Sequence, residues 1–285
     1  MIAFLLLAHE NPGRIAEFID DLALPDNLVF CHIDASSGIG EHEIAGRVSD
    51  DARGSLTIIP SRRVAWGEYS IVDATLRLLR AVAASGAAPT HAYLVSGADF
   101  VVRPIRELAD FLGATHQDFI EAHHHSIQWC GPGGLQNERY RRYFFYNART
   151  QPELFAKSLS WQIANTVERP LPAGTVPYLG SQWWTLRWAT CLKILALLES
   201  RADIEAFFRT TFIPDEMFFQ TLVRMVSPDD ELSAPLTFAK FAPGGKPLVF
   251  RDGGEDNAFR NCYLARKLDP GAMILRHWSS ERARA

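Results

Sequence analysis

The sequence predicts an α/β fold in which a mostly parallel central sheet carries helices on both faces. Two observations lead to this fold class. Short apolar runs of strand length alternate with longer segments whose apolar residues recur at helical spacing. The first run, residues 2–8, is apolar throughout, which is typical of a strand buried on both faces. Alternation of this kind builds parallel sheets that are covered on two sides.

The expected elements of the N-terminal part follow in order. After the strand at 2–8, Asn11-Pro12 begins a helix, because proline suits the first helical turn. A long helix is expected across 71–82, where apolar side chains share one face. Three more strands are expected, at residues 27–33, 56–59 and 92–95.

Polar side chains follow three of the predicted strands. They are His9-Glu10, His32-Ile33-Asp34 and Ser96-Gly97-Ala98-Asp99. In open α/β sheets, ligands bind beyond the carboxyl ends of the strands, so these groups would form a polar rim for a ligand. The alternative is that the aspartates and serines only cap the helices that come next.

The second half of the chain is less regular. Residues 121–136 are typical of a long functional loop and include three adjacent histidines, 123–125. They are not expected to share a metal ion, because consecutive side chains rarely point at one ion. The basic segment 276–284 is expected to be a solvated tail, with contact to acidic lipid as the alternative. No linker stands out, so one domain spanning 1–285 is predicted.

Composition narrows the class of protein. The chain has 285 residues and a formal net charge of −4, whereas proteins that bind nucleic acid usually show a basic excess. A hydrophobic content of 47% argues against disorder. The four cysteines form no C-x-x-C pair, so neither disulfides nor a zinc ribbon are expected. The first apolar run is too short to span a bilayer, so no transmembrane segment is expected.

Several common catalytic motifs are missing. No G-x-G-x-x-G follows the first strand, and neither G-x-x-x-x-G-K-[ST] nor G-x-S-x-G occurs. These absences argue against the usual dinucleotide, P-loop and serine-hydrolase sites.

Three segments in the second half carry candidate chemistry. In 180–184 (Gly-Ser-Gln-Trp-Trp), neighbouring tryptophans face opposite ways if the segment is extended, so one would be core and one could line a sugar groove. In 214–221, Glu216 could be a general base, although acids also suit a helix start. In 265–269, Arg266 and Lys267 could clamp a diphosphate, or they could be the solvated end of a short helix.

Taken in order, these segments resemble the core-2/I-branching β-1,6-N-acetylglucosaminyltransferase family, which includes the peptide O-xylosyltransferases. The matching segments run over nearly the whole chain, at residues 8–12, 32–34, 66–72, 94–100, 137–140, 180–184, 214–221 and 265–269. The resemblance implies a GT-A-like nucleotide-sugar transferase fold. Residues 1–120 would be mainly the donor half, and 121–285 mainly the acceptor and diphosphate half.

The resemblance also implies inverting chemistry without a divalent metal, and the sequence contains no D-x-D triplet. Glu216 would take the proton of an acceptor hydroxyl as that oxygen attacks the donor sugar. Lys267, with Arg266 beside it, would offset the negative charge on the departing UDP. Lys246 would be the second diphosphate cation, with Arg251 as its competitor.

The remaining site residues come from the resemblance as well. Those expected at the donor are His9, Asp34, Trp66, Ser70 and Asp99. Those expected at the glycan acceptor are Glu121, Arg139 and Trp183 or Trp184. In xylosyltransferases the Gly-Ser-x-Trp motif carries an aspartate assigned as the base, and here that position is Gln182. This departure favours Glu216 as the base but leaves the donor sugar open.

The predicted function is transfer of a sugar, with GlcNAc favoured, from a UDP-sugar to a hydroxyl of a glycan. Use of a xylosyl donor and a noncatalytic carbohydrate- or nucleotide-sugar-binding protein are the alternatives. No metal, no cofactor and no nucleic-acid partner are expected. Animal members of the family carry a membrane anchor and several disulfides, and we expect neither here. The expectation is a cytoplasmic enzyme of bacterial type, with peripheral contact at the inner face of the membrane left open.

Overall fold

The computed structural model describes residues 1–24, 26–130, 135–241, 247–253, 259 and 262–285. Its central sheet has seven strands in the order β10-β6-β9-β4-β1-β2-β3. The parallel half consists of β1 (Ile2–Ala8), β2 (Leu28–Asp34), β3 (Leu56–Arg62) and β4 (His91–Ser96). These strands confirm the sequence prediction, and each of the last three extends slightly beyond the predicted range.

The other half of the sheet is built from short strands. β9 (Thr185–Arg187) runs antiparallel to β4 and to β6 (Asp118–Phe119), and β10 (Leu232–Ser233) lies parallel to β6. Strands of two or three residues are too short to show an alternating pattern, so the sequence did not predict them.

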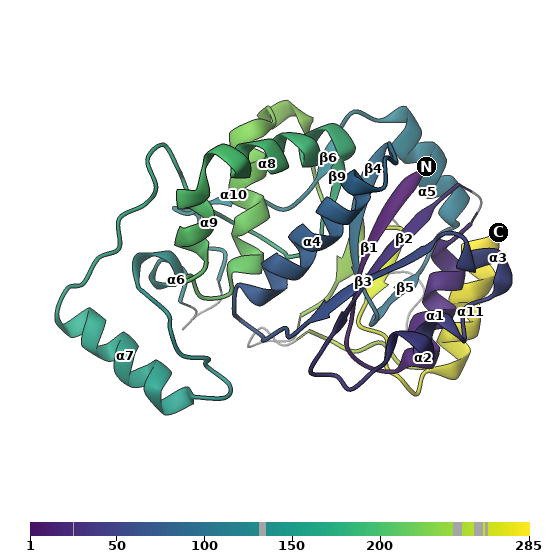
Figure 1. The fold of residues 1–285 in the computed structure, drawn as a ribbon, viewed down its shortest axis with the longest axis horizontal. Coiled ribbons are helices and arrows are strands. Elements are labelled where there is room, and N and C mark those ends of the chain that lie inside the picture. The colour runs from purple at the N-terminus through teal and green to yellow at the C-terminus, as the bar shows by residue number, and fades with distance from the viewer. Residues whose placement is uncertain (25, 131–134, 242–246, 254–258, 260–261) are drawn as a thin grey trace.

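Helices cover both faces of the sheet (Figure 1). On one face lie α4 (Ser70–Ala84), α8 (Trp188–Ser200), α9 (Ala202–Phe208) and α10 (Phe218–Val226). On the other lie α1 (Pro12–Leu22), α5 (Ile105–Ala114) and α11 (Met273–Arg284), with the short α2 (Glu41–Ala45) and α3 (Asp50–Arg53) beside α1. In β1, Ala3 and Leu5 pack into the first core, whereas Phe4 and Leu6 pack into the second. This double burial explains why the run 2–8 is apolar throughout.

A second sheet contains β11 (Thr237–Ala239), β12 (Leu264–Arg266) and β5 (Asp99–Val101). β12 runs antiparallel to β5 and sets Arg266 opposite Asp99. The expectation that the basic pair follows a short helix is therefore wrong. The strand was missed because it is three residues long and pairs with a segment far away in the sequence.

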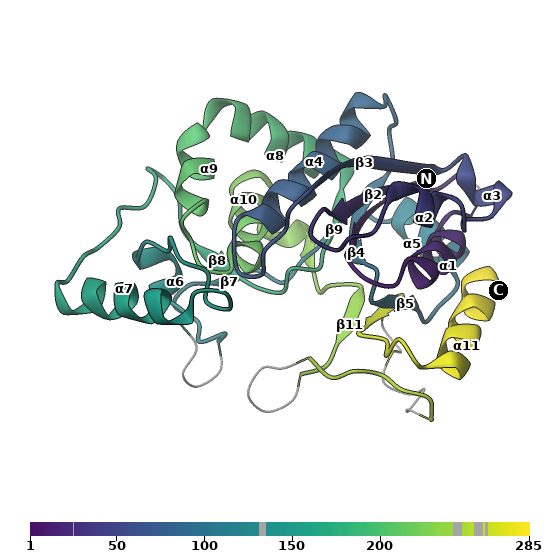
Figure 2. The ribbon, with the colours of Figure 1, turned by 60° about the horizontal axis from the view of Figure 1, so that its bottom comes forward.

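The remaining elements lie in the second half of the chain, residues 121–285. β7 (His123–His124) pairs with β8 (Tyr178–Leu179), and 3-10 turns occupy η1 (Pro214–Glu216) and η2 (Asp229–Glu231). The helices α6 (Glu138–Arg141) and α7 (Pro152–Ala164) lie at the opposite end of the molecule from α1 and α11 (Figures 1 and 2). Within the described parts of the chain, no helix has the length and apolar character needed to cross a bilayer.

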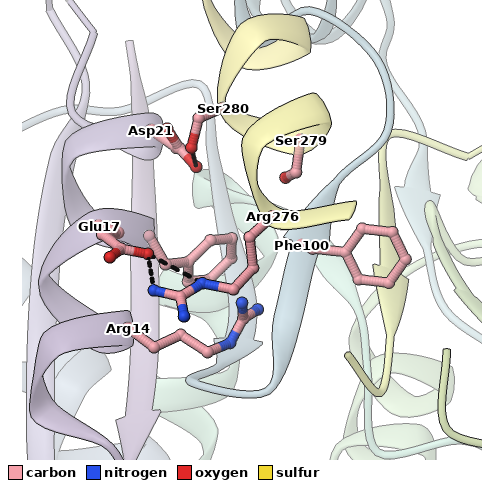
Figure 3. Close-up of a pocket in the computed structure, with 8 residues that line it drawn as sticks. Arg14, Glu17, Asp21, Phe100, Arg276, Ser279 and Ser280 are labelled. Atoms are coloured by element: carbon pink, nitrogen blue, oxygen red, sulfur yellow. Dashed lines mark hydrogen bonds and ion pairs between the residues drawn. The ribbon is translucent and has the colours of Figure 1, made fainter. Parts of the chain in front are cut away.

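The C-terminal segment is a packed helix, which corrects the expectation of a solvated tail. α11 lies against α1 (Figure 3), where Arg276 pairs with Glu17 and Ser280 Oγ donates to Asp21 Oδ2 at 3.0 Å. Val101 N–H donates to Ser279 Oγ at 2.9 Å, which joins the helix to β5. Because most of these contacts are polar, the segment lacks the apolar pattern by which a packed helix is usually found in a sequence. One domain spanning 1–285 stays a prediction.

Candidate active site

The carboxyl ends of β1 and β2 bring together two residues predicted to hold the donor. The strand order reverses at β1, which lies between β2 and β4, and ligands of open α/β sheets bind at such a point. His9 is exposed directly after β1 and lies near Asp34 at the end of β2. Burial opposes ionisation of Asp34, but hydrogen bonds from Ser36 and from Val64 N–H, together with His9, hold its pKa below the usual value.

Trp66 lies in the turn before α4, and Ser70 is the first residue of that helix. Ser70 Oγ accepts a hydrogen bond from Ala65 N–H at 2.9 Å, so this hydroxyl holds the turn. Trp66 is 41% exposed, and the guanidinium of Arg149 lies 3.9 Å from its ring centroid. Asn147 Nδ2 donates to the Trp66 carbonyl at 3.1 Å. The sequence around Arg149 has no regular pattern, so it did not predict that Arg149 stacks on Trp66.

Asp99 lies inside the protein, between the ends of β4 and β5. Its carboxylate accepts hydrogen bonds from the N–H and the Oγ of Ser96, both at 2.9 Å, and lies 3.6 Å from Arg266 Nε. Burial raises the pKa of Asp99, and Arg266 and Ser96 act against that rise. Asp99 is fully buried and not exposed at the polar rim, so its predicted role at the donor stays a prediction.

Lys267 is the candidate cation that lies near the strand ends. Its side chain is partly buried, and Glu10, which follows β1, is close enough to favour its charged form. Burial lowers the pKa of Lys267, and the nearby positive charges of Arg266 and Arg149 lower it further.

The other candidate cations differ from Lys267. Arg266 is buried and stacks on an aromatic ring, as described below. Arg251 is exposed and pairs with Asp269 at 2.9 Å, so its charge already has a partner. Lys246 lies outside the described residues, so its predicted role stays a prediction.

Glu216 ends η1, directly before α10. The expected helix start at residue 214 is wrong by four positions, because a 3-10 turn comes first and α10 begins at Phe218. Arg139 Nη1 donates to Glu216 Oε2 at 2.6 Å. Burial raises the pKa of the Glu216 carboxyl, and Arg139 acts in the opposite direction. The side chain of Glu216 is 29% exposed, so it is partly open to solvent.

Asp215 is buried beside Glu216. Burial, together with the neighbouring Glu216 carboxylate, raises the pKa of Asp215 to about 7. Among the described residues its Oδ1 atom has no hydrogen-bond partner. The neighbouring Glu216 carboxylate opposes the ionisation of Asp215, which adds to the effect of burial on the Asp215 pKa.

Glu121 joins several elements of the acceptor side. Its carboxylate accepts from Ser181 N–H at 2.9 Å and from Trp129 Nε1 at 3.0 Å, and His123 Nε2 lies 2.9 Å away. Gly180 N–H donates to the Glu216 carbonyl at 3.0 Å. The sequence placed Glu121 in a loop of unknown shape, and it did not single out Trp129.

The two adjacent tryptophans have different surroundings. Trp184 is buried and packs against Phe219, with ring centroids 4.9 Å apart, so it belongs to the core and cannot contact a substrate. Trp183 is partly buried and carries the guanidinium of Arg266 3.5 Å from its ring centroid. Trp184 is therefore the core tryptophan of the predicted pair, and Trp183 is left as the candidate for lining a sugar groove.

No group of three or more metal-ligating His, Cys, Asp or Glu side chains occurs within the described ranges. Two of the histidines at 123–125 contact polar side chains close by in the sequence. His123 Nε2 lies 2.9 Å from Glu121 Oε1, and His124 Nδ1 lies 2.7 Å from Ser126 Oγ. Metal independence stays a prediction, because substrate phosphates can themselves help to hold a metal ion.

The candidate residues occur along a chain whose sequence matches a known family nearly throughout. A model of the Core-2/I-branching enzymes matches residues 2–267. The chain belongs to the Core-2/I-branching enzyme family. Members of this family are glycosyltransferases, which take a nucleotide-sugar donor and a glycan acceptor, and the mostly parallel sheet agrees with a GT-A-like fold. A search of curated proteins found no match.

Proposed function

We propose that this family member is an inverting, metal-independent enzyme that transfers GlcNAc from a UDP-sugar to a hydroxyl of a glycan. The observation that supports the proposal most is the state of the Glu216 carboxylate. Its side chain is partly exposed, Arg139 Nη1 donates to it at 2.6 Å, and burial raises its pKa. A carboxylate with a raised pKa is better matched to proton abstraction near neutral pH than an ordinary one.

The proposed reaction is a single displacement. The acceptor hydroxyl oxygen forms a bond to the anomeric carbon while Glu216 takes its proton. The bond between that carbon and the UDP oxygen breaks on the opposite face, so the configuration inverts. UDP leaves with the bonding electron pair, and Lys267 offsets the charge that develops on it.

The two substrates would meet between the halves of the chain. His9, Asp34 and Trp66 would hold the nucleotide at the strand ends. Arg139 and Trp183 would contact the acceptor, and Arg139 would at the same time orient Glu216. These roles rest on the family resemblance together with the exposure and contacts described above.

A xylosyl donor is the second candidate. Gln182 stands where the xylosyltransferases carry their aspartate base, and an amide cannot take a proton. This substitution supports Glu216 as the base, but it does not distinguish one donor sugar from another.

Release of UDP in the presence of a glycan acceptor tests the proposal, with UDP-GlcNAc, UDP-xylose, UDP-galactose and UDP-glucose compared. We expect UDP-GlcNAc to turn over fastest. Glu216→Gln should lower kcat by roughly 10² to 10⁴, because the amide cannot act as a base. Glu199→Gln, an exposed change on α8, is the matched control and should leave kcat unchanged.

Two outcomes would overturn the proposal. Full activity of Glu216→Gln would remove its proposed base. Binding of glycan or nucleotide sugar without UDP release for any donor would favour the noncatalytic binding protein. The cytoplasmic location and peripheral membrane contact expected from the sequence stay predictions.

A further inference from the structure

Arg266 and Lys267 are neighbours in the chain but lie in different environments. Lys267 is partly exposed, whereas only 7% of the Arg266 side chain is exposed. A group that binds the leaving diphosphate must reach the solvent-filled site, and among these two cations Lys267 meets that condition. The burial of Arg266 calls for a different role.

The charge of Arg266 is held from one side by a buried aspartate. Arg266 lies directly opposite Asp99 in the antiparallel pair of β12 and β5, and its Nε is 3.6 Å from Asp99 Oδ1. Asp99 is itself fixed by Ser96, and Arg14 donates to the Asp99 and Gly97 carbonyls. The guanidinium therefore has little freedom to swing out towards a ligand.

On its other side Arg266 contacts Trp183. The guanidinium carbon lies 3.5 Å from the centroid of the indole, which is the closest of the cation–π contacts described for this chain. A planar guanidinium stacks on an aromatic ring and keeps its charge, whereas a lysine ammonium cannot stack in this way. Among the described residues, Arg266 Nη1 is buried without a hydrogen-bond partner, so stacking and the Asp99 contact are its main interactions.

Trp183 connects this buried pair to the base. Trp183 N–H donates to Ser181 Oγ at 3.4 Å, and Gln220 Nε2 donates to the Ser181 carbonyl at 2.7 Å. One residue earlier, Gly180 N–H donates to the carbonyl of Glu216. The short segment 180–183 therefore lies between Arg266 on the donor side and Glu216 on the acceptor side.

We propose that Arg266 is a positioning residue, which fixes the indole of Trp183 through stacking and the Asp99 contact, and is not a ligand of the diphosphate. This inference rests on the proposed function. Of the two neighbouring cations, Lys267 takes the diphosphate. Arg266 sets the orientation of Trp183. Through the segment 180–183 it also fixes the position of Glu216, the proposed base, relative to Lys267.

Binding of UDP, measured by calorimetry, separates the two roles. Lys267→Ala should weaken UDP binding by roughly tenfold or more, because a charge-assisted contact to phosphate is lost. Arg266→Lys keeps the positive charge but loses the stack, so it should change UDP affinity by less than about threefold while it lowers kcat/KM for the acceptor roughly tenfold. Loss of UDP affinity in Arg266→Lys equal to that in Lys267→Ala would overturn the inference.

A double-mutant cycle tests whether Arg266 acts through Trp183. Trp183→Leu removes the ring and leaves Arg266 beside Asp99, so it should also spare UDP binding and lower kcat/KM for the acceptor. The double variant should have the same kcat/KM for the acceptor as the less active single variant, because each change breaks the same Arg266–Trp183 interaction. Additive losses would contradict the positioning role.

Two controls complete the experiment. Arg187→Lys alters a partly buried, ion-paired arginine on β9 of the central sheet, and it should leave both UDP affinity and kcat/KM unchanged. The free energy of unfolding in urea is also measured for the wild type, both single variants and the double variant. In this measurement the effects of Arg266→Lys and Trp183→Leu should be coupled, whether or not the protein turns over substrate. If UDP does not bind the wild-type protein at all, the proposed function fails. If UDP binds but the unfolding cycle is additive, only the Arg266 inference fails.

Discussion

The ionisation of Glu216 depends on a few neighbouring side chains. Burial raises the pKa of its carboxyl, the Arg139 guanidinium lowers it, and the nearby Glu121 carboxylate raises it again. Arg139 is buried and held close by its hydrogen bond, so its charge is poorly screened. These residues therefore tune the pH at which the proposed base becomes active, in addition to any contact with substrate.

The pH profile of kcat/KM tests this tuning. A base acts when it is ionised, so activity should rise as the pH increases through the pKa of Glu216. Arg139→Gln removes a positive charge that lowers that pKa, so the rising limb should move to higher pH. Glu121→Gln removes a negative charge that raises it, so the rising limb should move to lower pH. Shifts in the reverse directions would contradict the assignment of Glu216 as the base.

At the scale of elements, the candidate site depends on a close approach between Gly180, which follows β8, and Glu121, which lies between β6 and β7. A Cβ atom built on Gly180 would lie 1.8 Å from the Glu121 carbonyl oxygen, which no side chain can tolerate. The absence of a side chain here lets the segment 180–183 lie against Glu121 and reach the carbonyl of Glu216. The glycine of the Gly-Ser-x-Trp motif is thus explained by packing.

Gly180→Ala tests that explanation. We expect it to destabilise the protein by about 1–3 kcal/mol in urea unfolding, because backbone must move to admit the methyl group. Gly113→Ala on α5 is the matched control, because a Cβ there meets no atom within 4 Å. The control should stabilise the protein by roughly 0.5–1 kcal/mol, because alanine favours a helix more than glycine does. Equal stability of the Gly180→Ala variant and the wild type would contradict the packing account.

The contact between α1 and α11 contains another buried carboxyl group, that of Asp21 (Figure 3). Burial raises the pKa of Asp21 from 3.8 to about 6, although Ser280 donates a hydrogen bond to it. Above that pH the folded protein carries a buried charge, which costs roughly 3 kcal/mol relative to the unfolded chain. Below pH 3.8 the carboxyl is protonated in both states, so the cost disappears.

Asp21→Asn should therefore stabilise the protein at pH 8, and the gain should shrink as the pH falls below about 6. Thermal unfolding at several pH values measures it. Asp110→Asn, an exposed change on α5, is the control and should show no comparable pH-dependent gain. A stabilisation by Asp21→Asn that does not change with pH would contradict the account.

At the scale of the whole molecule, the sequence predicted the parallel half of the fold better than the rest. β1 to β4 are long and apolar, so their pattern is visible without knowledge of their neighbours. β12 consists of three residues and is defined by its pairing with β5, so Arg266 looked like an exposed helix end. Only the packed structure distinguishes Trp183 from Trp184, because both have the same local sequence and both contact the core, but only Trp184 is fully buried in it.

In the candidate site, too, the local sequence indicates some residues, and others are recognised only from contacts in the folded structure. His9, Asp34 and Asp99 could be predicted because they follow predicted strands, and the order of the motifs indicated Glu216 and Arg139. Contacts between segments distant in the sequence could not be predicted. Examples are the position of Arg149 over Trp66 and the stacking of Arg266 on Trp183.

The most direct test of the whole account is release of UDP from UDP-GlcNAc, in the presence of a glycan acceptor, with and without excess EDTA. The account predicts the same rate in both conditions, because Lys267 and not a divalent ion offsets the charge of the departing UDP. Loss of activity in EDTA that is restored by Mg²⁺ or Mn²⁺ would contradict it.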